Sequence, residues 1–193
     1  MKTALILHGT SATPNDNWFP WLKERLEKNG YQVFVPQLPE AEHPNISRYT
    51  KYLLSPKKGF TFEENKILIG HSSGAVAVLG LLQSLPVGAR LGNCYMVSAF
   101  KQSLGWESLK DLFNPPFDYS KIKGKAKKLI FIHGDKDPFC PLAETQELAA
   151  KLNGEMHVIP DKKHFSISTD GSQYKQFPYL LDLILKQNPT ASS

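Results

Sequence analysis

Short apolar runs recur along the chain, separated by longer stretches in which apolar residues follow a helical spacing. The runs are ALIL (4–7), YQVFV (31–35), KILIG (66–70), CYMVS (94–98), KLIFI (128–132) and EMHVI (155–159). Several are apolar at successive positions, which is typical of strands covered on both faces in a parallel sheet. The pattern therefore predicts six parallel strands.

Four of the intervening stretches are predicted to be helices, at 18–26, 75–85, 142–152 and 177–186. Gly30 follows the end of the first and Pro86 closes the second, as helix stop signals do. Strands that alternate with helices imply right-handed crossovers and a three-layer α/β/α sandwich. We expect one domain over residues 1–193, because a chain of this length with 41% hydrophobic residues can enclose a single core.

Composition narrows the classes of function. The net charge of +5 owes much to the run KIKGKAKK (121–128), but no aromatic residues interleave it, so nucleic-acid binding is not expected. Cys94 and Cys140 lack the spacing of a disulfide framework or a zinc site, which favours two buried, reduced thiols. No segment approaches the roughly 20 apolar residues of a membrane span, and the first apolar stretch is too short for a signal peptide. We expect a soluble, cytoplasmic protein with no membrane partner.

The motif G-x-S-x-G occurs in LIGHSSGAVAV (68–78), where a strand is predicted to end and an apolar helix to begin. In this setting Ser72 lies on a sharp turn at a helix amino terminus, as the nucleophile of an acyl-transfer enzyme does. Gly70 and Gly74 fit this interpretation, because a Cβ at either position would strike neighbouring backbone. The alternative is a tight turn in which the serine has no chemical role.

A serine hydroxyl needs a base in contact with it and a carboxylate that orients this base. His164 follows the last predicted strand by five residues, in a loop that can return over Ser72, and we expect it to be the base. His71 is adjacent to Ser72 in the chain, but packing or hydrogen bonding within the turn explains it more simply.

The loop DKDPFCP (135–141) offers two carboxylates to orient the base. Asp137 is preferred to Asp135 because Pro138 holds the residue before it in an extended conformation and stiffens the loop. Either carboxylate can instead be an ordinary turn residue. With Asp137, the three residues occur in the nucleophile–acid–base order of α/β-hydrolases.

Acyl transfer also requires donors for the oxyanion that forms on the attacked carbonyl. We expect one to be the N–H of Ser73, directly after the nucleophile. The other is expected from HGTSATP (8–14), after the first strand, where Gly9 gives the backbone room and Thr10 N–H is the predicted donor. A plain glycine turn is the alternative for this loop. The sequence indicates neither a cofactor nor a metal cluster.

Five stretches carry a resemblance to a known family: NDNWFPWLKERLEKNGYQVFVPQLPEAEHP, ILIGHSSGAVAVL, VSAF, GDKDPFCPLAETQELAAKL and KKHF. Together they resemble the serine hydrolases grouped with retinoblastoma-binding protein 9 and its small bacterial relatives. The resemblance implies a compact α/β-hydrolase without a cofactor, a sheet order of 2-1-3-4-5-6, and a triad of Ser72, Asp137 and His164. The rival function is a protein-binding module, but the pocket-protein recognition sequence L-x-C-x-E is absent and no protein partner is indicated.

The predicted activity is hydrolysis of small or medium acyl esters through an acyl-enzyme; a thioesterase or an acyltransferase would use the same residues. Related hydrolases place a lid where this chain has residues 99–125, a segment rich in aromatic side chains. Trp106 and Phe113 of this segment, with Trp18 beyond the oxyanion loop, are predicted to line an apolar cleft for the small-molecule acyl substrate. Aromatic stripes with helical spacing more often belong to a core, which is the alternative here.

Overall fold

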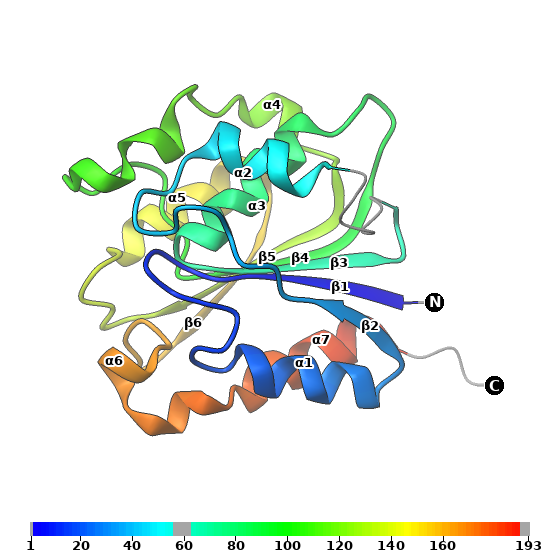
Figure 1. Cartoon of the computed structure of the whole chain (residues 1–193), viewed down its shortest axis with the longest axis vertical. Helices are drawn as coiled ribbons and strands as arrows, with labels where there is room; N and C mark the ends of the chain where they lie inside the picture. Colours follow the sequence, from blue (N-terminus) through cyan, green and yellow to red (C-terminus); the bar gives the residue numbers. More distant parts are fainter. Residues whose placement is uncertain (1, 56–62, 190–193) are drawn as a thin grey trace.

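A parallel sheet forms the middle layer of the computed structural model, which describes residues 2–55 and 63–189 (Figure 1). Its strands are β1 (Lys2–Leu7), β2 (Tyr31–Phe34), β3 (Lys66–His71), β4 (Leu91–Val97), β5 (Ala126–Gly134) and β6 (Glu155–Ile159). They lie in the order β2-β1-β3-β4-β5-β6, and every neighbouring pair is parallel. The expected architecture and strand order are confirmed.

Three strands begin earlier than the apolar runs predicted: β1 at Lys2, β4 at Leu91 and β5 at Ala126. In β4 and β5, Leu91 pairs with Ala126, ahead of the apolar runs that begin at 94 and 128, and Asn93 pairs with Lys128. Backbone hydrogen bonds extend a strand regardless of side-chain polarity, so Asn93 and Lys128 can join the ladder at this end of the sheet.

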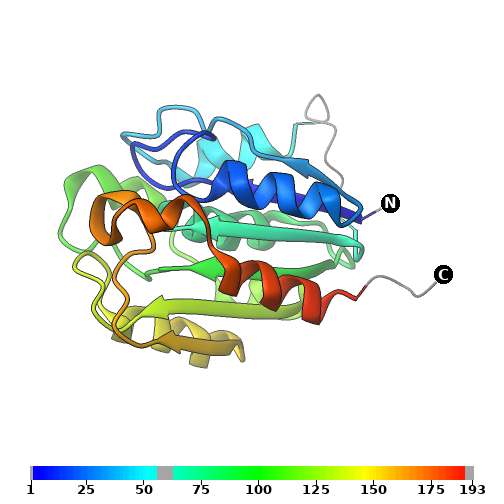
Figure 2. The same ribbon diagram turned by 90° about the horizontal axis from the view of Figure 1, so that it is seen from below.

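Helices cover both faces of the sheet (Figure 1). One face carries α2 (Ile46–Leu53), α3 (Ser73–Ser84), α4 (Tyr119–Ile122) and α5 (Leu142–Leu152), and the other carries α1 (Phe19–Lys28) and α7 (Pro178–Gln187). Figure 2 shows α1 and α7 lying across the second face, with α6 (Ile167–Asp170) before α7. Short 3-10 helices lie at Glu107–Phe113 and Ser172–Lys175. Within the described residues, no helix is long and apolar enough to cross a bilayer.

Two helices show how local sequence sets their ends. Helix α3 is almost entirely buried and stops at Ser84, because Leu85 precedes Pro86 and is therefore held in an extended conformation. Helix α2 was not expected from the sequence; its first turn is capped by the side chain of Asn45, which accepts a hydrogen bond from Arg48 N–H at 2.9 Å. Helix α2 packs against α3 at Gly80, where a Cβ would lie 2.1 Å from Ile46 Cδ1.

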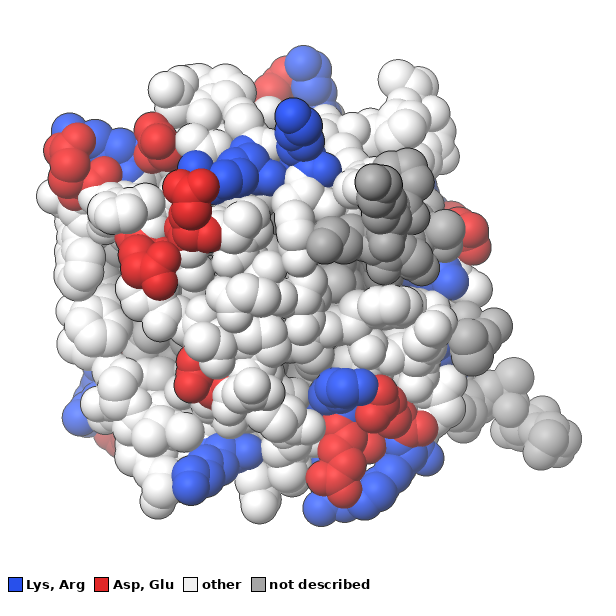
Figure 3. All heavy atoms as spheres, viewed as in Figure 1, with Lys and Arg blue, Asp and Glu red and all other residues white. Residues whose placement is uncertain are grey.

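Charged side chains of both signs lie beside one another on the face seen in Figure 3. On α1, for example, Lys23 pairs with Glu27 and Lys28 with Glu24. Lysines from the basic run also have acidic partners, since Lys127 lies 3.2 Å from Glu64 and Lys128 lies 3.5 Å from Glu155. This mixing of charge is in keeping with the expectation that the chain does not bind nucleic acid, which stays a prediction.

Candidate active site

Ser72 occupies the turn between β3 and α3, as the G-x-S-x-G pattern predicts. Its φ of 56° and ψ of −124° are uncommon for a residue with a Cβ, and such conformations persist only where the surroundings enforce them. Here the backbone is held on both sides: Ser72 N–H donates to Val97 O at 2.9 Å, and Ser72 O accepts from Ala75 N–H at 2.9 Å. The side chain reaches the wall of a pocket.

Glycines let three backbone segments meet around this turn. A Cβ on Gly70 would lie 2.5 Å from Gly74 O, and one on Gly74 would lie 2.3 Å from Leu7 O, which confirms the predicted reason for both residues. A Cβ on Gly9 would lie 3.1 Å from Ser72 Cβ. The loop after β1 therefore lies in close contact with the turn at Ser72.

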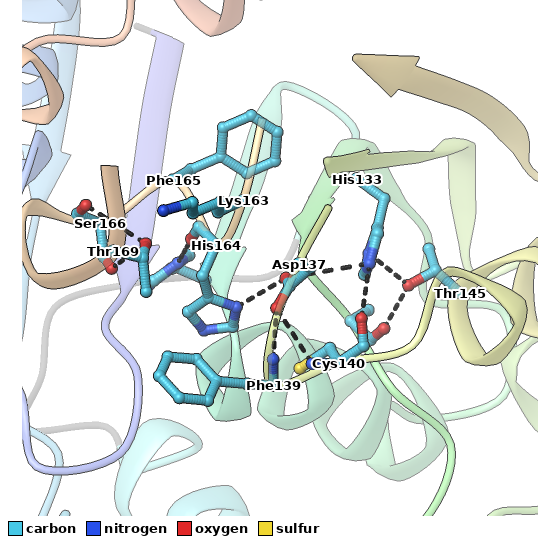
Figure 4. A network of polar contacts seen from close by, with 12 residues as sticks. His133, Asp137, Phe139, Cys140, Thr145, Lys163, His164, Phe165, Ser166 and Thr169 are labelled. Carbon is cyan, nitrogen blue, oxygen red and sulfur yellow. Dashed lines mark hydrogen bonds and ion pairs between the residues drawn. The ribbon is translucent and has the colours of Figure 1, made fainter. Parts of the chain in front are cut away.

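His164 and Asp137 form a hydrogen-bonded pair at the carboxyl ends of β5 and β6 (Figure 4). His164 Nδ1–H donates to Asp137 Oδ2 at 2.7 Å. The other carboxylate oxygen, Oδ1, accepts from the N–H groups of Phe139 at 2.9 Å and Cys140 at 3.0 Å. Since Nδ1 carries the proton toward Asp137, the neutral ring of His164 has its lone pair on Nε2.

The environment of Asp137 keeps this carboxyl ionised. Burial alone would raise its pKa, but the hydrogen bond and charge of His164, with the two N–H donors, outweigh burial and lower the pKa to about 2. Asp135, in contrast, is exposed on the same loop. The structure thus places Asp137, rather than Asp135, against the imidazole.

Ser72 and His164 line the same pocket, which has a volume of about 630 Å³. Within residues 2–55 and 63–189, no hydrogen bond joins the Ser72 hydroxyl to the His164 ring. Contacts of this kind are often long in the absence of substrate and shorten in the complex. The three predicted residues are therefore gathered at one site, with a contact between Asp137 and His164 and, in the part of the chain that the structure describes, no hydrogen bond from His164 to Ser72.

Three other histidines are buried and hold backbone in place. His71 Nε2–H donates to His164 O at 2.8 Å, and burial, with the nearby His164, lowers the pKa of His71 to about 3. His133 Nε2–H donates to Cys140 O at 2.9 Å and its pKa is also lowered by burial. His8 Nε2 accepts from Leu38 N–H at 2.9 Å. Each of the three has a structural partner, and burial lowers the pKa of each.

Thr10 and Ser73, the predicted oxyanion pair, are linked by their side chains. Thr10 Oγ1–H donates to Ser73 Oγ at 3.0 Å, which ties the loop after β1 to the first residue of α3. The first N–H groups of a helix have no intrahelical acceptor, so Ser73 N–H is not used within α3. Thr10 lines the pocket beside Ser72.

Two of the predicted substrate-binding residues do not line the pocket. Trp18 is fully buried, donates its Nε1–H to Phe165 O at 3.1 Å and packs its ring edge-on against Phe177, so it belongs to the core between α1 and α7. Phe113 lies one layer behind the pocket wall, with its ring centroid 5.8 Å from that of Phe100. The expectation that these two residues form the cleft is wrong, because the start of α1 turns Trp18 inward.

Trp106 does line the pocket and is 54% exposed. Its ring meets Phe139 edge-on at 6.3 Å between centroids, and Phe139 in turn meets the His164 ring at 5.2 Å. The segment 99–125 thus supplies part of an apolar wall, while Leu112 and Ile122 from the same segment belong to the core.

Two further lining residues, Phe100 and Leu109, belong to the segment 99–125 that was expected to supply part of the cleft. Sequence reasoning missed the others: Ser11, Ala12, Asp16, Asn17, Leu104, Phe139, Cys140, Ser166, Ile167 and Ser168. Most of them lie within a few residues of a predicted site residue in the sequence, and this closeness was the signal that could have identified them. Cys140 had been treated as inert, yet its sulfur, an Asp137 oxygen and a His164 nitrogen lie within 4.8 Å of one another.

Comparisons with known proteins agree with this geometry. Residues 4–186 match the family model for serine hydrolase. YdeN of Bacillus subtilis (strain 168) is 29% identical over 184 residues, which cover 95% of this chain and 94% of YdeN. The crystal structure of YdeN superposes with a TM-score of 0.89 at 28% identity, and the superposition covers 98% of this chain and 100% of YdeN. The serine hydrolase RBBP9 of Rattus norvegicus is 29% identical over 82% of this chain and 83% of RBBP9. The α/β hydrolase domain-containing protein 10 from mouse shares the fold, with a TM-score of 0.72 at 14% identity over 95% and 88%.

Proposed function

The chain belongs to the serine hydrolase family, and we propose that it is a carboxylesterase-like enzyme that cleaves small or medium acyl esters. The observation that carries the proposal is the 2.7 Å hydrogen bond from His164 to Asp137, made beside the pocket that also contains Ser72. A carboxylate that fixes the tautomer of an imidazole next to a serine is the arrangement that activates a serine hydroxyl.

In the first half of the proposed reaction, Ser72 Oγ attacks the ester carbonyl and its proton passes to His164 Nε2. The imidazolium that forms is stabilised by Asp137, which stays ionised because its pKa is about 2. The proton on Nε2 then moves to the leaving alcohol as the carbon–oxygen bond of the ester breaks. An acyl-enzyme on Ser72 remains.

In the second half, water attacks the acyl-enzyme while His164 takes a proton from it, and the acid is released with Ser72 restored. In both halves the negative charge on the carbonyl oxygen would be met by Ser73 N–H and Thr10 N–H. The hydrogen bond of 3.0 Å between the two side chains supports this role, because it keeps the two backbone donors in a fixed relation.

The pocket supports the proposed size of substrate. A volume of about 630 Å³ falls in the range of ordinary small-molecule sites. Phe100, Leu104, Trp106 and Phe139 give it an apolar side for an acyl chain. We expect higher rates with short and medium p-nitrophenyl esters than with long ones.

Labelling with a fluorophosphonate, which reacts with activated serines, tests the proposal. The wild-type protein should be labelled at Ser72, and Ser72→Ala should lose both labelling and ester turnover while it unfolds cooperatively as before. Ser168→Ala is the matched control, since Ser168 lines the same pocket and this variant should still be labelled at Ser72. Labelling of Ser72→Ala at another serine, or wild-type protein that neither reacts nor hydrolyses any ester of the panel, would contradict the proposal.

A further inference from the structure

A thiol lies beside the acid and the base, where the proposed reaction has no use for it. Cys140 is buried within the loop that carries Asp137, and Figure 4 shows its sulfur near the Asp137 carboxylate. The sulfur, one carboxylate oxygen and one ring nitrogen of His164 all lie within 4.8 Å of one another. Of the two ring nitrogens, Nδ1 is the one that faces Asp137.

These three groups are a ligand set for zinc and similar thiophilic cations. Imidazole, thiolate and carboxylate all bind Zn²⁺, at about 2.0 to 2.3 Å in a tetrahedral arrangement, which corresponds to ligand–ligand separations of roughly 3.2 to 3.8 Å. The 2.7 Å contact of His164 with Asp137 would open by about half an ångström, and the other separations, all within 4.8 Å, would close by at most about one ångström.

Two of the three ligands are held in place already. Cys140 N–H donates to Asp137 Oδ1 at 3.0 Å, which is a hydrogen bond inside the turn from Asp137 to Cys140. His133 Nε2–H donates to Cys140 O at 2.9 Å and holds the same turn against β5. Asp137 Oδ2 stays available once His164 Nδ1 has lost its proton. The third ligand, His164, comes from the separate loop after β6 and already contacts Asp137 Oδ2 at 2.7 Å.

The cluster is buried but lies beside the pocket. Cys140 and His164 both line the pocket, which gives a cation a route to the ligands and a position for water as a fourth ligand. Three protein ligands with one open position are a common form of zinc site.

We propose that Asp137, Cys140 and His164 form an inhibitory site for a thiophilic divalent cation such as Zn²⁺; the inhibition, though not the binding, rests on the proposed function. The cation would bind His164 Nδ1, and the proton of the ring would then stand on Nε2. A protonated Nε2 cannot accept the proton of Ser72, so catalysis stops. The thiol proton is released to solvent, and one proton is lost for each cation bound. Binding and inhibition therefore strengthen as the pH rises.

The first experiment is a Zn²⁺ titration of ester hydrolysis, with each variant compared with its own metal-free rate. The wild-type enzyme should be inhibited at micromolar Zn²⁺ and recover with a chelator. In Cys140→Ala and Cys140→Ser the half-inhibiting concentration should rise by about tenfold or more, the usual range for loss of a group that supports a metal. Cys94→Ala is the matched control, because Cys94 is buried in β4 and should leave inhibition as in the wild type.

The second experiment uses Co²⁺ and does not depend on activity. Wild-type protein and Cys94→Ala should show a thiolate-to-cobalt absorption band that Zn²⁺ displaces, and the Cys140 variants should lack it. If those variants do not fold, His164→Ala replaces them, since it keeps the thiol and should bind Co²⁺ about tenfold or more weakly. A wild-type protein without the band, or a Cys140 variant as sensitive to Zn²⁺ as wild type, would overturn the metal site. The band in a protein that hydrolyses no ester would instead retain the site and reject the proposed function.

Discussion

Ser72 lies between two regions of the molecule that fix their functional groups by different means. The base side consists of the two loops that carry Asp137 and His164, where hydrogen bonds to side chains set the positions. The nucleophile side consists of the turn at Ser72 and the loop of Gly9 and Thr10, where close backbone contacts at glycines set them. Alterations on the two sides should therefore have different consequences.

The two sides also treat charge differently. On the base side Asp137 is ionised, with a pKa of about 2, and is in contact with His164. On the nucleophile side His71 is neutral, with a pKa of about 3, and its only described hydrogen bond is to the His164 carbonyl at 2.8 Å. The two imidazole rings lie 4.9 Å apart, and of the two only that of His164 is hydrogen-bonded to a carboxylate, that of Asp137.

The largest effect should separate these two histidines by the same substitution. His164→Gln removes the proposed base, and we expect ester turnover to fall by about 10⁴-fold or more, nearly as far as in Ser72→Ala, because members of a triad act as a unit. His71→Gln keeps an amide donor that can reach the His164 carbonyl, and activity should stay within about tenfold of wild type.

Steady-state kinetics on both variants, with thermal unfolding to show that each is folded, makes this comparison. Greater damage from His71→Gln than from His164→Gln would move the base to the nucleophile side and reject the distinction drawn between the two regions.

A second comparison lies within the base side. Asp137→Asn should lower the turnover number by up to about 10⁴-fold, since the imidazole loses the carboxylate that fixes its tautomer and stabilises its charge. Asp135→Asn is the matched control two residues earlier on the same loop, with an exposed side chain, and its turnover should remain near wild type. A large loss in the control together with an active Asp137→Asn would mean that the hydrogen bond to His164 has no role in catalysis.

The sequence was most informative where backbone geometry restricts the choice of residue. Gly70 and Gly74 predicted a sharp turn, and the structure shows why neither position accepts a Cβ. The order of nucleophile, acid and base along the chain, with the carboxyl ends of parallel strands gathered at one edge, brought Asp137 and His164 together correctly. The order and meeting of these residues depend on chain topology, which the periodicity of apolar residues reveals.

Side-chain direction was the least predictable feature. Trp18 and Trp106 are both aromatic residues near loops of the site, but one is fully buried and the other 54% exposed, because the packing partners Phe165 and Phe177 come from distant parts of the chain. Periodicity assigns a residue to a helix face and does not say what covers that face. For the same reason the sequence did not predict that Cys140 lies beside His164.

The neutral imidazole of the nucleophile side makes stability depend on pH. His71 has a pKa of 6.5 when unfolded and about 3 when folded, so between these values the unfolded chain binds a proton that the folded protein does not. Its contribution is fully present above pH 6.5 and is lost as the pH falls toward 3. As the pH falls, the free energy of unfolding should therefore decrease less steeply in His71→Gln than in the wild type. The two slopes should differ by at most about 1.4 kcal/mol per pH unit.

Urea unfolding at pH values from 6.5 down to 4 measures this difference in slope. His8 and His133, whose pKa values are lowered as well, contribute equally to both proteins and cancel in the comparison. Asp137 loses its contribution only between pH 3.8 and about 2, below the range used. Equal slopes for wild type and His71→Gln would mean that His71 is protonated in the folded protein.

The smallest effect is expected from backbone spacing on the nucleophile side. In Gly9→Ala the new Cβ would lie 3.1 Å from Ser72 Cβ and 3.4 Å from His71 O, so the loop with Thr10 must retreat by a few tenths of an ångström. A donor displaced from the developing oxyanion lowers the rate more than it lowers binding, and we expect kcat to fall by about tenfold with little change in KM.

Gly88→Ala is the control for Gly9→Ala. The φ of +84° at Gly88 makes this substitution destabilising, but Gly88 is distant from Gly9 in the sequence and lies in the turn before β4. It should reduce the unfolding free energy and leave kcat near wild type. If Gly9→Ala keeps the wild-type kcat, close approach of this loop to Ser72 does not set the rate, and the nucleophile side does not depend on its glycine contacts in the way described above.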